Sequence, residues 1–360
     1  MKKILPLLLI ASTVISSCSK KSEPVITSPI INPVMPQVVT FAGSGNPGWI
    51  DQTKTLASFY APTGVAVDIN GFVYVADQVN NVVREITALG VVYTLAGNGS
   101  GGFMDGSVTA AEFNYPYSVA VDKNGDVFVA DQFNARIREV TLLPSPVVST
   151  FSGRGKPGLV NGIADSTEFS KPSGVAVGAN GNVYVADTFN NVIREISSKG
   201  ASTTFAGSSL PGSSDGTGTG ASFNNPTGLA IDSLGNLYVA DAGNNKIRKI
   251  TPLGVVTTLA GSGAAGNING AGTAASFNQP TGVAVDINGN VYVADSNNNL
   301  VRKIAPDGTV ITLAGTGQTG ATNGPLTSAS FSNPQGVATD IYGNVYVADT
   351  GNNLIRKILQ

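Results

Sequence analysis

One pattern recurs six times along this chain, and it constrains the fold more than any other feature. Its last copy reads VYVADTGNNLIRKI and occupies residues 345–358. The Asp of the pattern recurs with a step of 54 residues, except for one step of 56 where LLPSP at 142–146 lengthens a turn. The six positions are Asp77, Asp131, Asp187, Asp241, Asp295 and Asp349. Self-similarity at a fixed period predicts a repeat architecture.

Each repeat divides into four short segments with β character. In the fifth copy these are GVAVD, NVYVAD, NLVRKI and TVITLAG, at residues 282–286, 290–295, 299–304 and 309–315. Ile-Asn-Gly, Ser-Asn-Asn and Pro-Asp-Gly join them, and all of these residues favour tight turns. Four strands in an up-and-down meander make one propeller blade. We therefore predict an all-β chain that forms a six-bladed β-propeller of four-stranded antiparallel blades.

The two ends of the repeat region indicate how the ring closes. The sixth copy has three of the four strands and stops at Gln360, whereas QVVTFAG at 37–43 matches a fourth strand and has no blade before it. We expect this N-terminal strand to join the last blade, which leaves the ring without an open edge.

The repeated motifs resemble a known family. The patterns F-x-x-P-x-G-V-A-V-D, G-N-V-Y-V-A-D, N-N-x-I-R-K-I and T-L-A-G are similar to the NHL repeat across nearly all of residues 37–360. The resemblance implies a propeller over that range. It implies no single activity, because NHL propellers include protein-binding, RNA-binding and enzymatic members.

The N-terminal region has the composition of an export signal. Lys2 and Lys3 precede the apolar run ILPLLLIASTVI, and the small residues of ISSC follow at 15–18, so residues 1–17 are interpreted as a signal peptide. ISSC resembles the bacterial lipobox, which implies a lipidated Cys18; the alternative is a plain secretory signal. Residues 18–36 contain four Pro and no repeat element, which indicates an extended tether. We expect a lipid-anchored protein of the bacterial cell envelope, on the outer membrane if the envelope has two.

Composition narrows the function classes. The chain has 0 His and 1 Cys, which removes most catalytic and metal-binding chemistry and any disulfide within a monomer. A net charge of -2 gives no basic face for nucleic acid. We expect no cofactor, no metal and no nucleic-acid partner, and a monomeric protein that contacts the membrane only through its lipid. Some resembling propellers are lyases or hydrolases that use channel His or carboxylates, and this chain offers neither on its predicted inner strands.

The Asp of each repeat is followed seven residues later by an Arg. These are Arg84, Arg138, Arg194, Arg248, Arg302 and Arg356. In a hairpin that turns at the Asn pair, the two side chains lie on the same face of adjacent strands, within reach of each other. An active site breaks the symmetry of its scaffold, whereas this pair repeats in every copy. We interpret the pairs as structural, and we expect the Asn residues of the turn, such as Asn352 and Asn353, to bond to their own turn.

A second acidic motif resembles the start of a calcium loop. DKNGD at 122–126 has relatives in other repeats, but an EF-hand loop has Gly sixth and Glu twelfth, whereas here Gly is fourth and the twelfth residue is Phe133. We predict hairpin turns at these places.

The connections between repeats vary more than the strands do. Each has about 20 residues, and a meander brings it out on the same face as the turn between the second and third strands. Their shared G-x-x-[DN] pattern carries large apolar residues in the first three copies, whereas the last three copies are mostly small or polar there; the residues are Trp49, Ile50, Phe103, Met104, Leu159 and Val160. Tyr60, Tyr115 and Tyr117 fall in the same half. We predict a binding surface formed by Trp49, Tyr60, Phe103, Tyr115, Tyr117 and Leu159; the alternative is that Trp49 and Phe103 cap their own blades.

These observations favour a non-catalytic envelope lipoprotein whose propeller binds a protein or peptide. Two alternatives stay open. One is an envelope lyase or hydrolase on the same scaffold. The other is a glycan-binding module, because Trp and Tyr also stack on sugars.

Overall fold

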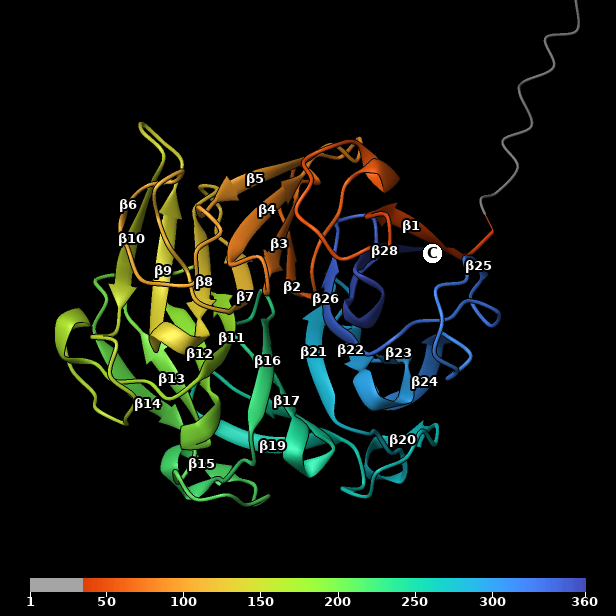
Figure 1. Cartoon of the computed structure of the whole chain (residues 1–360). Coiled ribbons are helices and arrows are strands. Elements are labelled where there is room, and N and C mark those ends of the chain that lie inside the picture. The colour runs from red at the N-terminus through yellow and green to blue at the C-terminus, as the bar shows by residue number, and fades with distance from the viewer. Residues whose placement is uncertain (1–34) are drawn as a thin grey trace, which may run out of the picture. The chain divides into compact units, whose positions relative to one another are not determined.

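The computed structural model describes residues 35–360, and in this range the chain consists of strands and short 3-10 helices. Six sheets surround a central axis, and the first strand of each repeat lies nearest the axis (Figure 1). The predicted all-β six-bladed propeller of four-stranded antiparallel blades is confirmed. The predicted signal peptide, Cys18 and most of the predicted tether lie outside the described residues.

The first three blades each place their four strands in chain order from the axis outward. Blade 1 contains β2 (Pro62–Val67), β3 (Val73–Asp77), β4 (Val82–Ile86) and β5 (Val92–Ala96). Blade 2 contains β7 (Pro116–Val121), β8 (Val127–Asp131), β9 (Arg136–Thr141) and β10 (Val147–Ser152). Blade 3 contains β11 (Pro172–Val177), β12 (Val183–Asp187), β13 (Val192–Ile196) and β14 (Ser202–Ala206).

Blades 4 and 5 have the same arrangement from the axis outward, and in blade 6 the N-terminal strand takes the outer position. Blade 4 contains β16 (Pro226–Ile231), β17 (Leu237–Asp241), β18 (Lys246–Ile250) and β19 (Val255–Ala260). Blade 5 contains β21 (Pro280–Val285), β22 (Val291–Asp295), β23 (Leu300–Ile304) and β24 (Thr309–Ala314). Blade 6 contains β26 (Pro334–Thr339), β27 (Val345–Asp349), β28 (Leu354–Leu359) and β1 (Gln37–Ala42).

Blade 6 joins the two ends of the domain. Strand β1 pairs antiparallel with β28, with Val38 opposite Ile358 and Thr40 opposite Arg356. The N-terminal strand is therefore the outer strand of the last blade, as the sequence predicts, and it leaves no inner strand of that sheet unpaired.

The connections between blades do not stand above the ring. Each runs along the outer strand of the following blade, and in four blades it adds a two-residue strand there. These strands are β6 (Gly106–Ser107), β15 (Gly216–Thr217), β20 (Gly270–Ala271) and β25 (Gly324–Pro325). In blade 1, Thr53 makes a single bridge to Val91 instead. The long connections thus cover the outer sheet edges, which would otherwise present unpaired backbone groups.

Short 3-10 helices occur at two kinds of place. Four lie in the connections: η1 (Lys54–Leu56), η3 (Ala164–Ser166), η5 (Gly218–Gly220) and η7 (Gly272–Ala274). Five form the turn between the second and third strands: η2 (Gln132–Asn134), η4 (Thr188–Asn190), η6 (Ala242–Asn244), η8 (Ser296–Asn298) and η9 (Thr350–Asn352). We call the face that carries these turns the turn face.

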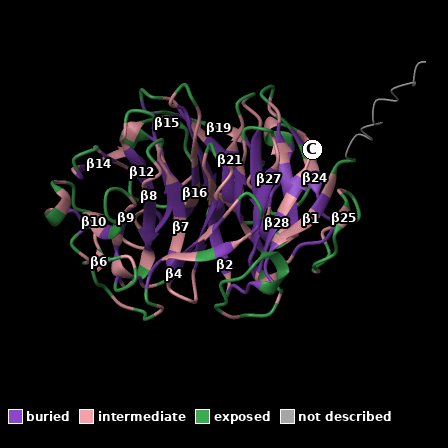
Figure 2. Cartoon of the chain, turned by 90° about the horizontal axis from the view of Figure 1, so that it is seen from above, coloured by how far each residue is buried: buried purple, intermediate pink, exposed green. Residues whose placement is uncertain are grey.

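Buried residues are concentrated on the strands (Figure 2). They form apolar clusters between neighbouring sheets. Val73 and Ile86 of blade 1, for example, share one apolar cluster with Tyr346 and Ala338 of blade 6. Each repeat also contributes one fully buried Phe from its connection. These are Phe59, Phe113, Phe169, Phe223, Phe277 and Phe331. Every blade is therefore stabilised by its neighbours, and no blade buries its apolar faces alone.

The inner strands approach one another very closely. A Cβ atom on Gly228 would overlap the carbonyl oxygen of Thr281 in the next blade, and one on Gly174 would overlap that of Thr227. Glycine is required at such contacts because it alone lacks the Cβ. The repeated Gly of the inner strands thus keeps the central channel narrow.

Candidate functional site

The six Asp–Arg pairs build the framework under the turn face. In each blade the Asp and Arg side chains are fully buried, and an Arg nitrogen lies 2.7 to 2.9 Å from an Asp oxygen. The Arg also stacks on the buried Phe of its connection, as Arg84 does on Phe59 at 5.0 Å. Removing one partner of such a buried ion pair strongly destabilises the folded protein, because the other charge stays buried without compensation.

The second terminal nitrogen of each Arg, Nη2, holds the connection in place. In blade 1, Nη2 of Arg84 donates to the carbonyl oxygen of Ile50 at 3.1 Å and to the carboxylate of Asp51 at 2.6 Å. The equivalent acceptors in the six blades are Asp51, Asp105, Asn161, Asp215, Asn269 and Asn323. The sequence reveals the [DN] of G-x-x-[DN] as a repeated position, but it does not reveal that this residue binds the Arg.

Five of the six turns carry two Asn, and these two residues have different roles. Asn80 donates to Asp77 at 2.9 Å and to the carbonyl oxygen of Gly48 at 2.8 Å, so it ties the turn to the incoming connection. The second Asn of the turn bonds to the next blade. Oδ1 of Asn353 accepts from the backbone N–H of Ala61 at 2.9 Å. The prediction that this residue bonds to its own turn is wrong, because its side chain bonds to Ala61 and Gly45, which the ring closure brings beside it.

This framework holds six residues in an unusual backbone conformation at the channel mouth. Each immediately precedes the Pro that begins an inner strand and has a positive φ of 48° to 55°. They are Ala61, Tyr115, Lys171, Asn225, Gln279 and Asn333. Positive φ is uncommon for residues other than Gly, and such positions cluster at functional sites. The backbone is repeated around the mouth, but the side chains differ in size and polarity.

Aromatic side chains gather at the mouth over blades 2 and 3. Tyr115 stacks on Phe133 with ring centroids 4.7 Å apart. The ammonium group of Lys171 lies 5.1 Å from the Phe133 ring and 4.5 Å from the Phe189 ring. Phe133 and Phe189 are 48% and 56% exposed, so these rings are available to a ligand. We call these four residues the aromatic ridge.

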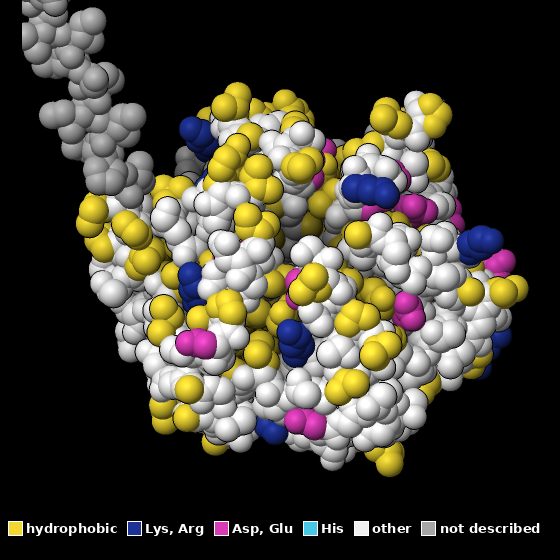
Figure 3. Space-filling model, turned by 180° about the vertical axis from the view of Figure 1, so that it is seen from behind, with side chains coloured by type: hydrophobic (Ala, Val, Ile, Leu, Met, Phe, Trp, Pro, Cys, Tyr) yellow, Lys and Arg dark blue, Asp and Glu magenta, His cyan; other side chains and the backbone are white. Residues whose placement is uncertain are grey.

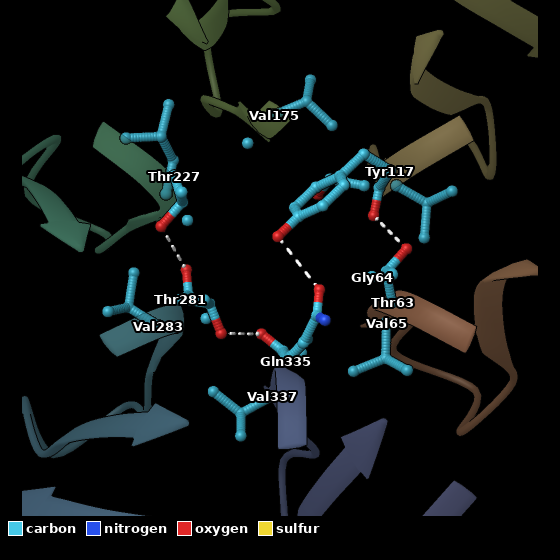
Figure 4. A pocket seen from close by; sticks show the side chains of 17 residues that line it. Thr63, Gly64, Val65, Tyr117, Val175, Thr227, Thr281, Val283, Gln335 and Val337 are labelled. Atoms are coloured by element: carbon cyan, nitrogen blue, oxygen red, sulfur yellow. Dashed lines mark hydrogen bonds between the residues drawn. The ribbon is translucent and has the colours of Figure 1, made fainter. Parts of the chain in front are cut away.

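The channel below the mouth is closed by side chains. The Tyr117 hydroxyl donates to Oε1 of Gln335 at 3.0 Å across the axis (Figure 4). Thr63, Thr227 and Thr281 form hydroxyl-to-carbonyl bonds between adjacent inner strands in the same layer. The cavity at this layer measures only about 50 Å³. Burial raises the pKa of Tyr117 to about 12, so its hydroxyl stays protonated and donates.

A larger recess lies above this layer. Its volume is about 620 Å³ and all six blades contribute to its lining. Seven lining residues carry a carboxamide: Gln78, Asn225, Gln279, Asn297, Asn299, Asn333 and Gln335. The described residues that line it also include Tyr117 and Phe189, and none of them carries a formal charge. We call it the amide recess.

The other predicted site residues lie elsewhere. Trp49 packs on its own blade, where Nε1 donates to Thr94 at 2.8 Å. The Phe103 ring lies 3.6 Å from the Arg136 guanidinium. Leu159 occupies the same position in the connection to blade 3 and is 40% exposed. The structure therefore separates these three outer-flank residues, one to a blade, from the mouth.

The three Tyr residues of the predicted surface also lie at different places in the structure. Tyr60 lies beside the turn of blade 1, where its N–H donates to Asp77, and it is 45% exposed. Tyr115 belongs to the aromatic ridge and Tyr117 to the channel. Phe133, Lys171 and Phe189 are absent from the predicted surface. A signal for them was present, since each occupies a variable position next to an invariant Asp, Asn or Pro of the repeat.

The opposite face carries the predicted hairpin turns. Oδ1 of Asp68 accepts from the N–H groups of Asn70 and Phe72 at 2.9 and 2.8 Å, which confirms the turn interpretation. Residues 35–360 contain no group of three or more His, Cys, Asp and Glu arranged to hold a metal ion. The same range includes no helix that is long and apolar enough to span a bilayer. The side chains on the face seen in Figure 3 are mostly uncharged, with scattered ionic groups.

Sequence and structure comparisons support the repeat assignment. Four segments match the NHL repeat, at residues 169–192, 223–250, 277–304 and 331–358. The chain is 33% identical over 298 residues to the chloroplastic protein SUPPRESSOR OF QUENCHING 1 of Arabidopsis thaliana, a match that covers 77% of this chain and 28% of that protein. It is 31% identical over 303 residues to NHL repeat-containing protein 2 of Bos taurus, covering 74% and 42%. The chain thus spans less than half the length of either relative.

A solved structure shares the fold. The chain superposes on an auxiliary nutrient binding protein from Bacteroides ovatus with a TM-score of 0.69 and 19% identity, over 90% of this chain and 76% of that one. At this identity the likeness concerns the fold alone. The chain therefore contains four segments that match the NHL repeat, and its described part forms a six-bladed β-propeller.

Proposed function

We propose that this protein is a non-catalytic binding protein whose ligand sits at the channel mouth on the turn face. One observation carries the proposal: a framework of six buried Asp–Arg pairs holds the same backbone around the mouth in every blade, while the side chains that this backbone presents differ from blade to blade. Binding residues commonly occupy loops held by a rigid scaffold. The exposed rings of the aromatic ridge supply the large contact area that recognition surfaces use.

We further propose that the protein is lipid-anchored in the bacterial cell envelope through Cys18 and that its ligand is a protein or peptide. ISSC and the Pro-rich segment support the anchor, and the aromatic ridge with its cation supports the ligand class. A binding role is also in keeping with the nutrient binding protein that shares the fold. Burial raises the pKa of Tyr117 to about 12, so its hydroxyl stays protonated near neutral pH and is not available there as a general base.

A second candidate is glycan binding. The amide recess favours it, because its lining offers many hydrogen-bonding groups and no charge. An envelope lyase or hydrolase is a third outcome of the tests, and turnover of a captured ligand would establish it.

The test compares mouth variants with outer-flank variants. Phe133→Ala and Phe189→Ala should each weaken ligand capture by residues 37–360 from envelope extract, with a loss of about 2 kcal/mol of affinity once the ligand is purified. Trp49→Ala and Phe103→Ala should bind normally and melt at lower temperature. The reverse pattern would move the site to the outer flank. In the full chain, Cys18→Ala should release the protein from membranes, and a variant that still pellets with them would refute the anchor.

A further inference from the structure

We infer that the amide recess binds a segment of a neutral oligosaccharide. The inference rests on the proposed binding site at the channel mouth, and it develops the second candidate function, glycan binding, by naming the class of glycan. The recess volume of about 620 Å³ lies within the range of roughly 300–1,000 Å³ that is usual for sites that enclose small ligands.

The absence of charge in the described lining disfavours ionic ligands. A carboxylate, phosphate or ammonium group that entered the recess would lose hydration without gaining an opposite charge, and uncompensated burial of this kind is costly. The cation of the aromatic ridge, Lys171, is held against the faces of Phe133 and Phe189. Among the described lining residues, neutral donors and acceptors are the groups that remain.

The backbone at the mouth is already occupied, which argues against a peptide bound as an added strand. Each inner strand begins with Pro, which has no N–H to offer. The N–H groups of Asn225, Gln279 and Asn333 are bonded to Asn of the preceding blade at 2.8 to 2.9 Å. A peptide added to a sheet needs free backbone groups of this kind. The recess must therefore recognise its ligand through side chains.

Those side chains match a sugar. A carboxamide carries both donors and acceptors, as neighbouring sugar hydroxyls do, and seven carboxamides surround the recess. Asn299 uses both of its groups within the protein, so the other six are the ones that can serve a ligand. Thr227 and Thr281 use their hydroxyl protons on backbone carbonyls, which leaves their oxygen lone pairs as acceptors. Phe189 is exposed at the edge and offers an aromatic face to the apolar C–H face of a sugar ring.

The experiment uses calorimetry with defined probes. Residues 37–360 are titrated with neutral hexasaccharides (malto-, cello-, xylo- and galacto-oligosaccharides) and with charged counterparts, oligogalacturonate and chitosan oligomers. We expect one or more of the neutral probes to bind about tenfold more tightly than any charged probe. The affinity of that neutral probe should not change with salt concentration. Blade 5 provides a matched pair of exposed Asn residues. Asn297→Ala, at the recess, should weaken binding about fivefold. Asn288→Ala, in the turn on the face opposite the turn face, should leave binding unchanged.

A second set of variants changes Phe189. Phe189→Ala should weaken the binding of the neutral probe about tenfold, and Phe189→Tyr, which keeps the ring, should restore it. Melting temperatures check that each variant is folded. The inference is overturned if no neutral probe binds, if charged probes bind as well, or if Asn288→Ala and Asn297→Ala behave alike. If a protein or peptide is instead captured through Phe133 and Phe189 while no sugar binds, the proposed function stands and this inference fails.

Discussion

At the scale of single residues, the charges around the buried Arg differ between blades. Arg84, Arg138 and Arg248 each contact two carboxylates, one fully buried and one on the connection that is 41% to 50% exposed. In the other three blades an Asn takes the place of the second carboxylate, so the buried Asp is the sole carboxylate bound to the Arg among the described residues. The same repeat thus contains two electrostatic versions of one pair.

This difference predicts unequal costs for the same substitution. Asp187→Asn leaves Arg194 buried without a carboxylate and should lower the free energy of unfolding by about 3 kcal/mol. Asp77→Asn leaves Arg84 bound to Asp51 at 2.6 Å and should cost about half as much. Urea denaturation of both variants measures the costs. Equal losses would mean that the half-exposed Asp51 contributes nothing.

At the scale of strands and turns, one junction lacks a bond that the others have. In five blades the second Asn of the turn accepts a backbone N–H of the next blade at 2.8 to 3.0 Å. Blade 2 has Ala135 at this position, with the same left-handed conformation at a φ of 49°. The junction between blades 2 and 3 therefore lacks this side-chain bond to Lys171.

Restoring the Asn should strengthen that junction. Ala135→Asn places a residue that tolerates positive φ where the backbone already requires it, and it supplies an acceptor for the Lys171 N–H. We expect a gain of about 1 kcal/mol, and a similar loss for Asn191→Ala at the next junction. Thermal melting of both variants is the measurement. If Ala135→Asn is no more stable than the wild type, the bridging bonds do not hold the blades together.

The third strands of the first two blades carry a Glu that is disfavoured in its charged form. Burial raises the pKa of Glu139, and the charges of Asp126 and Asp122 raise it further. Because the native pKa exceeds the unfolded one, the contribution of Glu139 to stability is greatest at acidic pH and declines as pH rises through the native pKa. Glu139→Gln should therefore raise the melting temperature at pH 7, by about 1 °C, and have no effect near pH 4. A gain that is equal at both pH values would assign the effect to packing.

The elements differ in how far the sequence predicts them. Strands such as β22 follow from alternating residues between turn signals, which are local properties, and the predicted range 290–295 differs from Val291–Asp295 by one residue. The course of the connections could not be predicted, because their contacts with the outer strand involve backbone pairing without a side-chain pattern. The aromatic ridge was missed for a related reason. Lys171 meets Phe133 only because blades 2 and 3 are neighbours in the ring, and no short stretch of sequence contains both.

At the scale of the whole molecule, closure through blade 6 controls stability. Deleting residues 37–43 removes β1, exposes the edge of β28 and opens the ring, and the apolar contacts of Val38 and Ala42 in two interblade clusters are lost as well. We expect this deletion to lower the melting temperature far more than deletion of residues 19–36. Differential scanning calorimetry of the two deletion variants is decisive, and equal melting temperatures would contradict the role of β1 in closure.

The pairing of β1 with β28 also concerns the biogenesis of the protein. Ribosomes make β1 before any other strand of the propeller and β28 last, so the first strand waits without its partner until the whole domain has been synthesised. During this time β1 keeps a free hydrogen-bonding edge, and such edges promote association with other chains. A chain cut short before Leu354 would lack the strand that pairs with β1, so its ring could not close.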